Sequence, residues 1–255
     1  MKVLLVKIFT WLLERIGDLG CEWAKNKYKE MYANHKELED KRSKRLKRKL
    51  LKYMKSHEPR RPYNLDISVY GRRVEKLLKF TRDRLCDGIE MCKLIGTTTV
   101  LPSAMVKDMS LYQGTWKSHG DKVKGLAEKG EYKAYRVVCV AHRKLLDDVK
   151  VNSAAYNEYF EWCEGSCIET RIFDGDYISE VKKNGILLID YMLFSDLFVF
   201  GSANSITEKE IETYLFVDDD DLYKYKIMAK EVLRKSVEVK DIKSLKKHLN
   251  EKLRE

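Results

Sequence analysis

Hydrophobic positions in the first quarter of the chain recur at helical spacing. Between residues 3 and 23 they keep one side of a helix broadly apolar. No proline occurs before Pro59, so the pattern predicts one long helix or a kinked pair over residues 2–56. After Tyr32 the apolar positions thin to a narrow stripe on a charged rod, which is too little to form a core of its own. The apolar positions of the first part are Val3, Leu4, Phe9, Trp11, Leu12, Ile16, Leu19 and Trp23.

A break follows between Glu58 and Pro62, where two prolines end the helical pattern. Helical spacing then resumes over residues 66–95. From residue 96 to 238, short runs rich in β-branched and aromatic residues alternate with amphipathic stretches. The pattern predicts strands over 97–101, 136–140, 167–173, 185–190, 196–201 and 214–217, helices over 110–130, 154–163 and 221–236, and a short charged helix over 241–255.

This alternation of strands and helices predicts an α/β sandwich. We expect a mixed sheet, because the runs on either side of Phe194-Ser195 are close enough to form a hairpin. The predicted domain organisation has four segments: a helical arm over 1–58, a linker and connecting helix over 59–95, the α/β domain over 96–238, and a helical tail over 239–255.

The composition is that of a folded and strongly basic protein. With 44% hydrophobic and 35% charged residues in 255, the chain can bury a core, which excludes a disordered chain and a disulfide-stapled mini-protein. The formal net charge of +10 predicts attraction to polyanions such as nucleic acid or an anionic membrane face. Scattered cysteines without a framework spacing predict reduced thiols and a cytoplasmic location. The single glutamine, Gln113, beside abundant Lys and Glu suits a thermophilic source.

The apolar N-terminal stretch does not have the pattern of a membrane span. Lys7 interrupts it and Glu14-Arg15 ends it, short of the roughly 20 residues that a span requires. No cleavage site of the signal-peptide type follows. Three roles for an amphipathic helix stay open: peripheral contact with an anionic membrane, pairing with a second copy in a coiled-coil homodimer, and a cover on the chain's own core.

Basic residues are concentrated in the second half of the predicted arm. The run from Lys41 to Lys55 holds nine Lys and Arg residues and no acid, so pairing within the helix cannot neutralise it. A continuous cationic face of this kind is suited to the phosphates of a nucleic acid. The predicted nucleic-acid-binding residues are Lys41, Arg42, Lys44, Arg45, Lys47, Arg48, Lys49 and Lys52.

Two segments near the end of the predicted sheet carry a family motif. Asp190 follows an apolar run, and after a hairpin comes the turn Gly201-Ser202-Ala203-Asn204. Over residues 90–238 the chain resembles the phospholipase D-like superfamily, whose motif is His-x-Lys-x4-Asp on a strand, a return strand and a Gly-Ser-x-Asn turn. The order of a Trp-bearing helix, a strand with Arg136 and a second Trp-bearing helix is also similar to that family.

The chain departs from this motif where the chemistry of the family takes place. The positions of the family's His nucleophile and phosphate-holding Lys are Lys183 and Gly185. Because phosphodiester transfer needs a nucleophile of suitable pKa, the resemblance implies a domain that binds without catalysis. It also implies an anion-binding or ligand-binding site formed by Lys183, Asp190, Ser202 and Asn204.

An enzymatic alternative rests on a second, imperfect match. His142-Arg143-Lys144 is followed by Asp147 and Asp148, with the acid closer than in the motif. In this alternative the protein is a divergent phosphodiesterase or nuclease that uses His142 and Lys144. It requires His142 to share an anion pocket with Asp190 or Asn204.

No metal or cofactor site is predicted. Cys163-x3-Cys167 and Cys86-x5-Cys92 lack the spacing of zinc sites, and no glycine-rich phosphate loop is present. The sequence therefore predicts a non-catalytic binding or regulatory protein that contacts nucleic acid or another polyanion through its arm and forms a homodimer. The alternatives are the divergent phosphodiesterase and a peripheral membrane protein anchored by residues 3–23.

Overall fold

The computed structural model describes residues 92–108, 113–195, 197–203 and 211–254, the strand at 63–65, and single residues of the N-terminal third. The chain divides into two compact units, Met1–Lys49 and Leu50–Glu255. In the first unit every described residue is helical and exposed; these are Lys27, Lys29, Glu30, Ala33, Lys41, Lys44, Arg45 and Arg48. The predicted break at 58–62, the apolar positions of residues 3–23 and, apart from the buried helical Leu77, most of the predicted helix at 66–95 lie outside the described residues.

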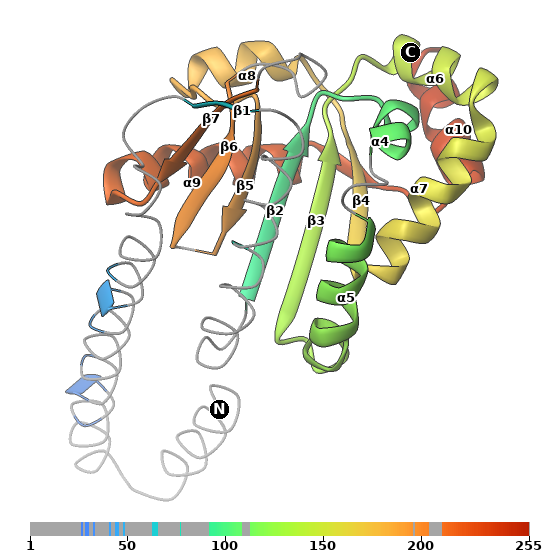
Figure 1. Ribbon diagram of the computed structural model, residues 1–255. Helices are drawn as coiled ribbons and strands as arrows, with labels where there is room; N and C mark the ends of the chain where they lie inside the picture. Colours follow the sequence, from blue (N-terminus) through green and yellow to red (C-terminus); the bar gives the residue numbers. More distant parts are fainter. Residues whose placement is uncertain are drawn as a thin grey trace, which may run out of the picture. The chain divides into compact units, whose positions relative to one another are not determined.

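The second unit is built on one mixed sheet (Figure 1). Its strand order is β1-β7-β6-β5-β2-β3-β4-β8. β2, β3 and β4 are mutually parallel, whereas every other neighbouring pair is antiparallel. The predicted α/β fold with a mixed sheet is therefore confirmed. The strands are β1 Tyr63–Leu65, β2 Cys92–Thr98, β3 Tyr132–Val138, β4 Ile168–Phe173, β5 Asp190–Phe194, β6 Phe198–Ser202, β7 Ile211–Phe216 and β8 Ser236–Glu238.

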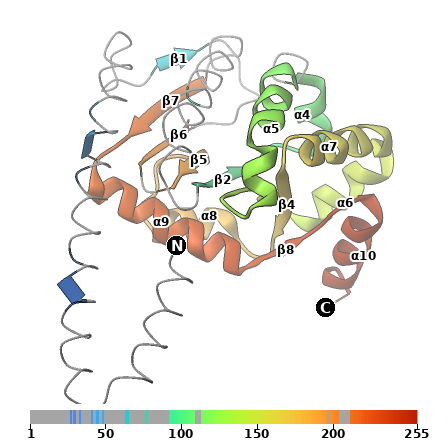
Figure 2. The ribbon, with the colours of Figure 1, turned by 90° about the horizontal axis from the view of Figure 1, so that it is seen from below.

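Helices cover both faces of this sheet. Figure 2 shows α5 and α7 on one side of β3 and β4 and α9 on the other. The parallel strands are joined by helical crossovers, as parallel pairing requires: α4 and α5 connect β2 to β3, and α6 and α7 connect β3 to β4. The helices are α4 Pro102–Asp108, α5 Gln113–Glu128, α6 His142–Val151, α7 Ser153–Gly165, α8 Tyr177–Lys183, α9 Asp219–Arg234 and α10 Ile242–Lys252.

Helix α9 covers one face of the sheet and contributes its buried residues to the hydrophobic core. The helix begins after the N-cap Asp218 and carries acidic residues in its first turn, where they interact favourably with the helix dipole. Its apolar residues recur at helical spacing and pack against β2, β3, β5 and β6. The buried residues of α9 are Leu222, Tyr225, Met228, Ala229 and Val232, and the strand residues that they join in one cluster include Ile95, Val137, Leu193 and Val199.

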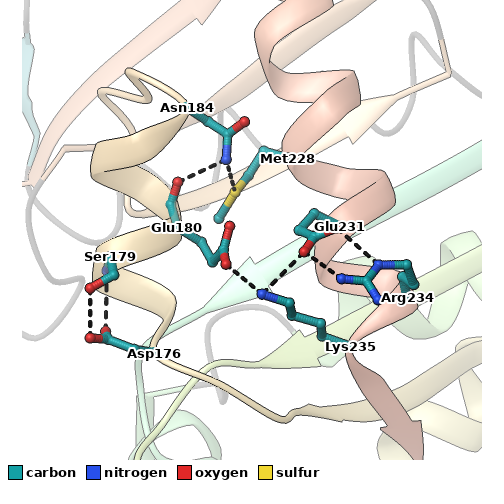
Figure 3. A network of polar contacts seen from close by, with 8 residues as sticks. All are labelled: Asp176, Ser179, Glu180, Asn184, Met228, Glu231, Arg234 and Lys235. Atoms are coloured by element: carbon teal, nitrogen blue, oxygen red, sulfur yellow. Dashed lines mark hydrogen bonds and ion pairs between the residues drawn. The ribbon is translucent and has the colours of Figure 1, made fainter.

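Polar contacts fix the short helix α8 to α9 (Figure 3). Lys235, just beyond α9, reaches Glu180 of α8 at 2.5 Å and Glu231 of its own helix at 3.1 Å. Asn184, at the end of α8, donates to the sulfur of Met228 at 3.6 Å. These contacts position α8 and with it the turn that leads into β5.

The structure confirms most of the predicted regular elements. The helices expected over 110–130, 154–163, 221–236 and 241–255 are α5, α7, α9 and α10, and the strands expected over 136–140, 167–173 and 214–217 are β3, β4 and β7. None of the helices that the structure describes has a stretch long and apolar enough to cross a membrane.

Several boundaries were predicted incorrectly, and several short elements were not predicted. Cys92–Ile95, expected at the end of a helix, belongs to β2, because residues 92–98 pair with β3. Residues 185–190, expected as a strand, are irregular as far as Asp190, because Gly185 turns the chain at φ 58°. The elements β1, α4, α6, α8 and β8 are additional.

Two glycines of α5 test the packing of this layer. A Cβ at Gly120 would lie 2.5 Å from the Gly165 carbonyl oxygen and 2.6 Å from the Cα of Ser166, whereas one at Gly125 would meet nothing within 4 Å. We expect Gly120→Ala to lower the free energy of unfolding by about 1–3 kcal/mol. Gly125→Ala should raise it by about 0.5–1 kcal/mol through helix propensity alone. Urea titrations would measure both, and equal effects of the two variants would contradict the described contact of α5 with α7.

Candidate functional site

A row of buried polar side chains crosses three antiparallel strands. Asp190 of β5 lies opposite Ser202 of β6, and Ser202 lies opposite Thr213 of β7. Opposite residues of antiparallel strands project to the same face of the sheet, so the three side chains form one line. All three are almost fully buried, with exposed fractions of 2%, 0% and 1%. We call Asp190, Ser202 and Thr213 the polar row.

The carboxylate of Asp190 is held by the residue that follows β2. Its Oδ1 accepts hydrogen bonds from the backbone N–H of Thr99 at 2.6 Å and from the Thr99 hydroxyl at 3.1 Å. Burial nevertheless raises the pKa of Asp190 to about 6, because the charged form loses its hydration, while the bonds from Thr99 and the charge of Arg136 act in the opposite direction. Asp190 therefore changes charge in a pH range where an exposed aspartate is fully ionised.

The other two members of the polar row have unused hydrogen-bonding capacity. Neither the Ser202 Oγ nor the Thr213 Oγ1 has a hydrogen-bond partner among the described residues. A buried hydroxyl without a partner costs about 1–3 kcal/mol. Two such hydroxyls beside an acid with a raised pKa make the polar row the chemically most distinctive part of the sheet.

Thr97 and Thr99, at the end of β2, form hydrogen bonds with two different parts of the domain. Thr97 accepts a hydrogen bond from the Tyr177 hydroxyl at 3.1 Å on the α9 side, and Thr99 binds Asp190. The sequence indicated that this run was β-branched but gave no sign that Thr99 would contact Asp190. The sequence analysis also missed Thr213. This residue lies in β7, and only the order of strands in the sheet shows that β7 pairs with β6 and places Thr213 opposite Ser202.

The structure brings together two of the four predicted anion-site residues. Asp190 and Ser202 are directly paired. Lys183 is exposed on the last turn of α8, and Gly185 lies in the following turn, so the two positions that correspond to the family's His and Lys are not on β5. Asn204 lies outside the described residues.

His142 and Lys144 do not form a site with Asp190. His142 begins α6 and contacts Asp174, 3.1 Å away, at the end of β4. The sheet order places β4 three strands from β5, a lateral separation of about 14 Å. Lys144 is exposed two residues further along the same helix, and residues at this spacing do not face each other. His142 therefore shares no pocket with Asp190, whereas Asn204, the other residue that the enzymatic alternative named, lies outside the described residues.

Three cysteines in the described part of the chain are free thiols: Cys139, Cys163 and Cys167. Burial raises the pKa of each, most strongly that of Cys139, because the thiolate would lose its hydration. A raised pKa keeps a thiol protonated and poorly nucleophilic. Cys163 is buried, whereas Cys139 and Cys167 are partly exposed.

The basic segment of the first unit is helical where the structure describes it. Lys41, Lys44, Arg45 and Arg48 are all in helical conformation and exposed. Their spacing of i, i+3, i+4 and i+7 places them on one face of the helix. We call these four residues the basic face. The remaining predicted nucleic-acid-binding residues, Arg42, Lys47, Lys49 and Lys52, lie outside the described residues.

Comparisons with known proteins add no family to this description. No family model matches the chain, and no curated protein is significantly similar to it.

Proposed function

We propose that the protein binds nucleic acid through the basic face and has no catalytic role there. The observation that carries this proposal is the placement of Lys41, Lys44, Arg45 and Arg48, four exposed cations on one side of a helix. The run from Lys41 to Lys55 contains no acidic residue, so it is strongly cationic over its whole length.

The dimensions of the basic face fit a phosphate backbone. Seven residues of α-helix rise about 10 Å, and duplex DNA carries one negative charge per 1.7 Å of its axis, about six over that length. Each phosphate contact releases condensed counterions, which stabilises the complex at low salt. Arg45 and Arg48 add a guanidinium that can bind a phosphate with two hydrogen bonds.

Nucleic acid suits this face better than a lipid surface does. A helix that lies on a membrane combines its cations with an apolar face that enters the acyl region. After Tyr32 the sequence offers only a narrow apolar stripe for such insertion. The peripheral membrane alternative depends instead on residues 3–23, which lie outside the described residues, as does the helix expected to form the homodimer.

We also propose that the sheet domain is a phospholipase D-like domain that binds without catalysis. Several features support this: Asp190 begins one strand of a hairpin, Gly201-Ser202 ends the return strand, and β3 with Arg136 precedes α7 with Trp162 in the order expected for the family. The positions of the catalytic His and Lys hold Lys183 and Gly185, neither of which can act as the imidazole nucleophile.

Fluorescence anisotropy of labelled single-stranded and double-stranded DNA and RNA across a salt series tests the first proposal. The variant Lys44→Gln/Arg45→Gln/Arg48→Gln should bind about 10- to 100-fold more weakly near 100 mM salt, with the slope of log K against log salt reduced by about 2 to 3. The matched control is Lys122→Gln/Lys124→Gln/Lys129→Gln, which removes the same charge from exposed positions on and just after α5. Equal losses in both variants, or no binding by the unchanged protein at low salt, would refute the basic face as the binding site.

The same complexes incubated with Mg²⁺ and separated on a denaturing gel test the second proposal. We expect intact nucleic acid after prolonged incubation. Cleavage by the unchanged protein that His142→Ala abolishes would replace this proposal with the divergent nuclease.

A further inference from the structure

Two histidines and one aspartate meet at the surface of the sheet domain, away from the polar row. The Nε2 atoms of His142 and His248 lie 3.1 Å and 2.8 Å from the same oxygen, Oδ1 of Asp174. The two imidazole rings are in edge contact, with centroids 5.6 Å apart. The side chains are 19%, 10% and 21% exposed for His142, His248 and Asp174, so solvent reaches the cluster while the protein encloses most of it.

Three separate elements bring these ligands together. His142 is the first residue of α6, Asp174 follows the last residue of β4, and His248 lies in the middle of α10. α6 and α10 pack against each other. The backbone N–H of Asp174 donates to the carbonyl of Lys235 at 2.8 Å, which fixes the loop that carries the carboxylate.

The start of α10 is fixed as well, and this determines the position of His248. The Asp241 side chain accepts a hydrogen bond from the backbone N–H of Ser244 at 2.7 Å, and the Ser244 hydroxyl accepts one from the backbone N–H of Asp241, which together form a capping box. Two turns later His248 contacts Asp174 and His142 and is buried together with Leu245 and Leu249. The cluster is therefore held by packed elements on each side.

We propose that His142, Asp174 and His248 bind a divalent transition-metal ion, with Zn²⁺ as the best-suited ion, and leave a fourth coordination position open to solvent. Neutral imidazole and carboxylate are ligands that Zn²⁺ uses, and three protein ligands with one open position is a common zinc arrangement. Mg²⁺ and Ca²⁺ prefer sites made of oxygen ligands, so two imidazoles disfavour them.

The distances suit this assignment. In a tetrahedron with bonds of 2.0–2.1 Å, neighbouring ligand atoms are about 3.3 Å apart. The two imidazole-to-carboxylate distances of 3.1 and 2.8 Å are close to this, and the three ligand atoms all lie within 4.8 Å of one another. His142 Nε2 also lies 3.3 Å from the Phe173 carbonyl oxygen, and a bound ion would replace that contact.

Metal binding at this place would join parts of the chain that are far apart in sequence. The ion would link α6 and the end of β4 to α10, the last described helix. Binding to the folded state alone stabilises a protein by mass action, so Zn²⁺ should protect the domain from unfolding. This proposal rests on different residues from nucleic-acid binding, and either can fail without the other.

Two measurements on the full chain test the proposal. Co²⁺ added to metal-free protein should produce the visible absorption of a tetrahedral site, and Zn²⁺ should abolish it by displacement. Zn²⁺ at about 100 times its Kd should raise the Tm by about 5 to 10 °C, and Mg²⁺ at the same concentration should not. If no Co²⁺ spectrum appears and Zn²⁺ does not shift the Tm, the cluster is only a hydrogen-bonded contact between α6, β4 and α10, and the proposal is wrong.

Variants locate the binding. His248→Gln and Asp174→Asn keep side chains of similar size that can still form hydrogen bonds, and each should weaken Zn²⁺ binding by at least about 100-fold, more than the loss of an outer-shell partner. The matched control is Asp147→Asn, the same change at an exposed position of α6 that pairs with Arg143 outside the cluster. Unchanged Zn²⁺ affinity in either ligand variant, in protein that retains its circular dichroism spectrum, would place the metal elsewhere and overturn the proposal.

Discussion

Replacing Gly201 with alanine is expected to lower the free energy of unfolding by at least about 3 kcal/mol, the upper part of the range for overpacked cores. Gly201 lies in β6 directly opposite Tyr191 of β5. A Cβ there would lie 2.2 Å from the Asp190 carbonyl oxygen and 2.6 Å from the Cα of Tyr191, and both are backbone atoms of the adjacent strand. The hairpin can accept a methyl group only by separating the two strands that carry the polar row.

Gly96 provides the matched control for this change. Gly96 is a buried glycine in β2. β5 lies between β2 and β6 in the sheet, so both glycines are on strands that pair with β5. A Cβ at Gly96 would find its nearest neighbours at 3.7 to 3.9 Å, which is ordinary van der Waals contact. Gly96→Ala should therefore change the free energy of unfolding by less than about 1 kcal/mol. Urea titrations would measure both variants, and a Gly201→Ala protein as stable as Gly96→Ala would contradict the described pairing of β5 with β6.

The second large effect concerns the pH dependence of stability. The pKa of Asp190 is raised by burial from 3.8 to about 6 in the folded protein. Between these values the folded protein keeps a proton that the unfolded chain has lost, so the free energy of unfolding falls as the pH rises from about 4 to about 6. Above pH 6 the loss is constant, at about 3 kcal/mol relative to the fully protonated state, because each pKa unit corresponds to 1.36 kcal/mol.

Asp190→Asn should remove this contribution while keeping a carbonyl oxygen that accepts the hydrogen bonds from Thr99. Relative to the unchanged protein, we expect Asp190→Asn to gain about 2 kcal/mol in the free energy of unfolding between pH 4.5 and pH 8. Comparing the two proteins at each pH cancels the titration of all other groups. Asp121→Asn, an exposed position on α5, serves as the control. If Asp190→Asn and Asp121→Asn showed the same pH dependence, Asp190 would have an ordinary pKa and would not be desolvated in the folded protein.

These two results would also bear on the role of the polar row. A buried acid that loses its proton near pH 6 and two hydroxyls without partners among the described residues do not supply the imidazole nucleophile and cation that phosphodiester transfer in the proposed family needs. They do supply donors and acceptors in a place shielded from water. This is in keeping with the proposal of a domain that binds without catalysis and leaves the cationic contribution to the basic face.

The sequence alone predicted much of the fold, because the long elements are encoded by local periodicity. The amphipathic pattern of α9, the glycine stop after α5 and the β-branched run of β3 each depend on residues within a few turns of one another. A hairpin was predicted here for the same reason, but its first strand was expected over 185–190 instead of Asp190–Phe194, so the pairing of Asp190 with Ser202 came only from the structure. The helical character and charge of the basic face also follow from its own residues.

Elements and contacts that depend on distant residues could not be predicted in this way. Cys92–Ile95 has apolar positions that fit a helix, yet these residues form a strand because β3 and β5 pair with β2 on both sides. α8 is short and is stabilised partly by Glu180 binding Lys235, which lies 55 residues away in the sequence. Helix α6 was missed because its ten residues directly follow a strand and immediately precede another helix.

The candidate sites show the same division. The sequence by itself determined which chemical groups are available: the basic run, Lys183 and Gly185 where the proposed family has His and Lys, and the side chains of Asp190 and Ser202. Only the tertiary structure decided that Thr99 binds Asp190, that Thr213 extends the polar row, and that His142 meets Asp174 and His248 instead of Asp190. Local patterns of apolar residues determine whether a segment forms a helix or a strand. The order of strands and the packing of helices determine which side chains come together, and this arrangement depends on how the whole chain buries its apolar residues.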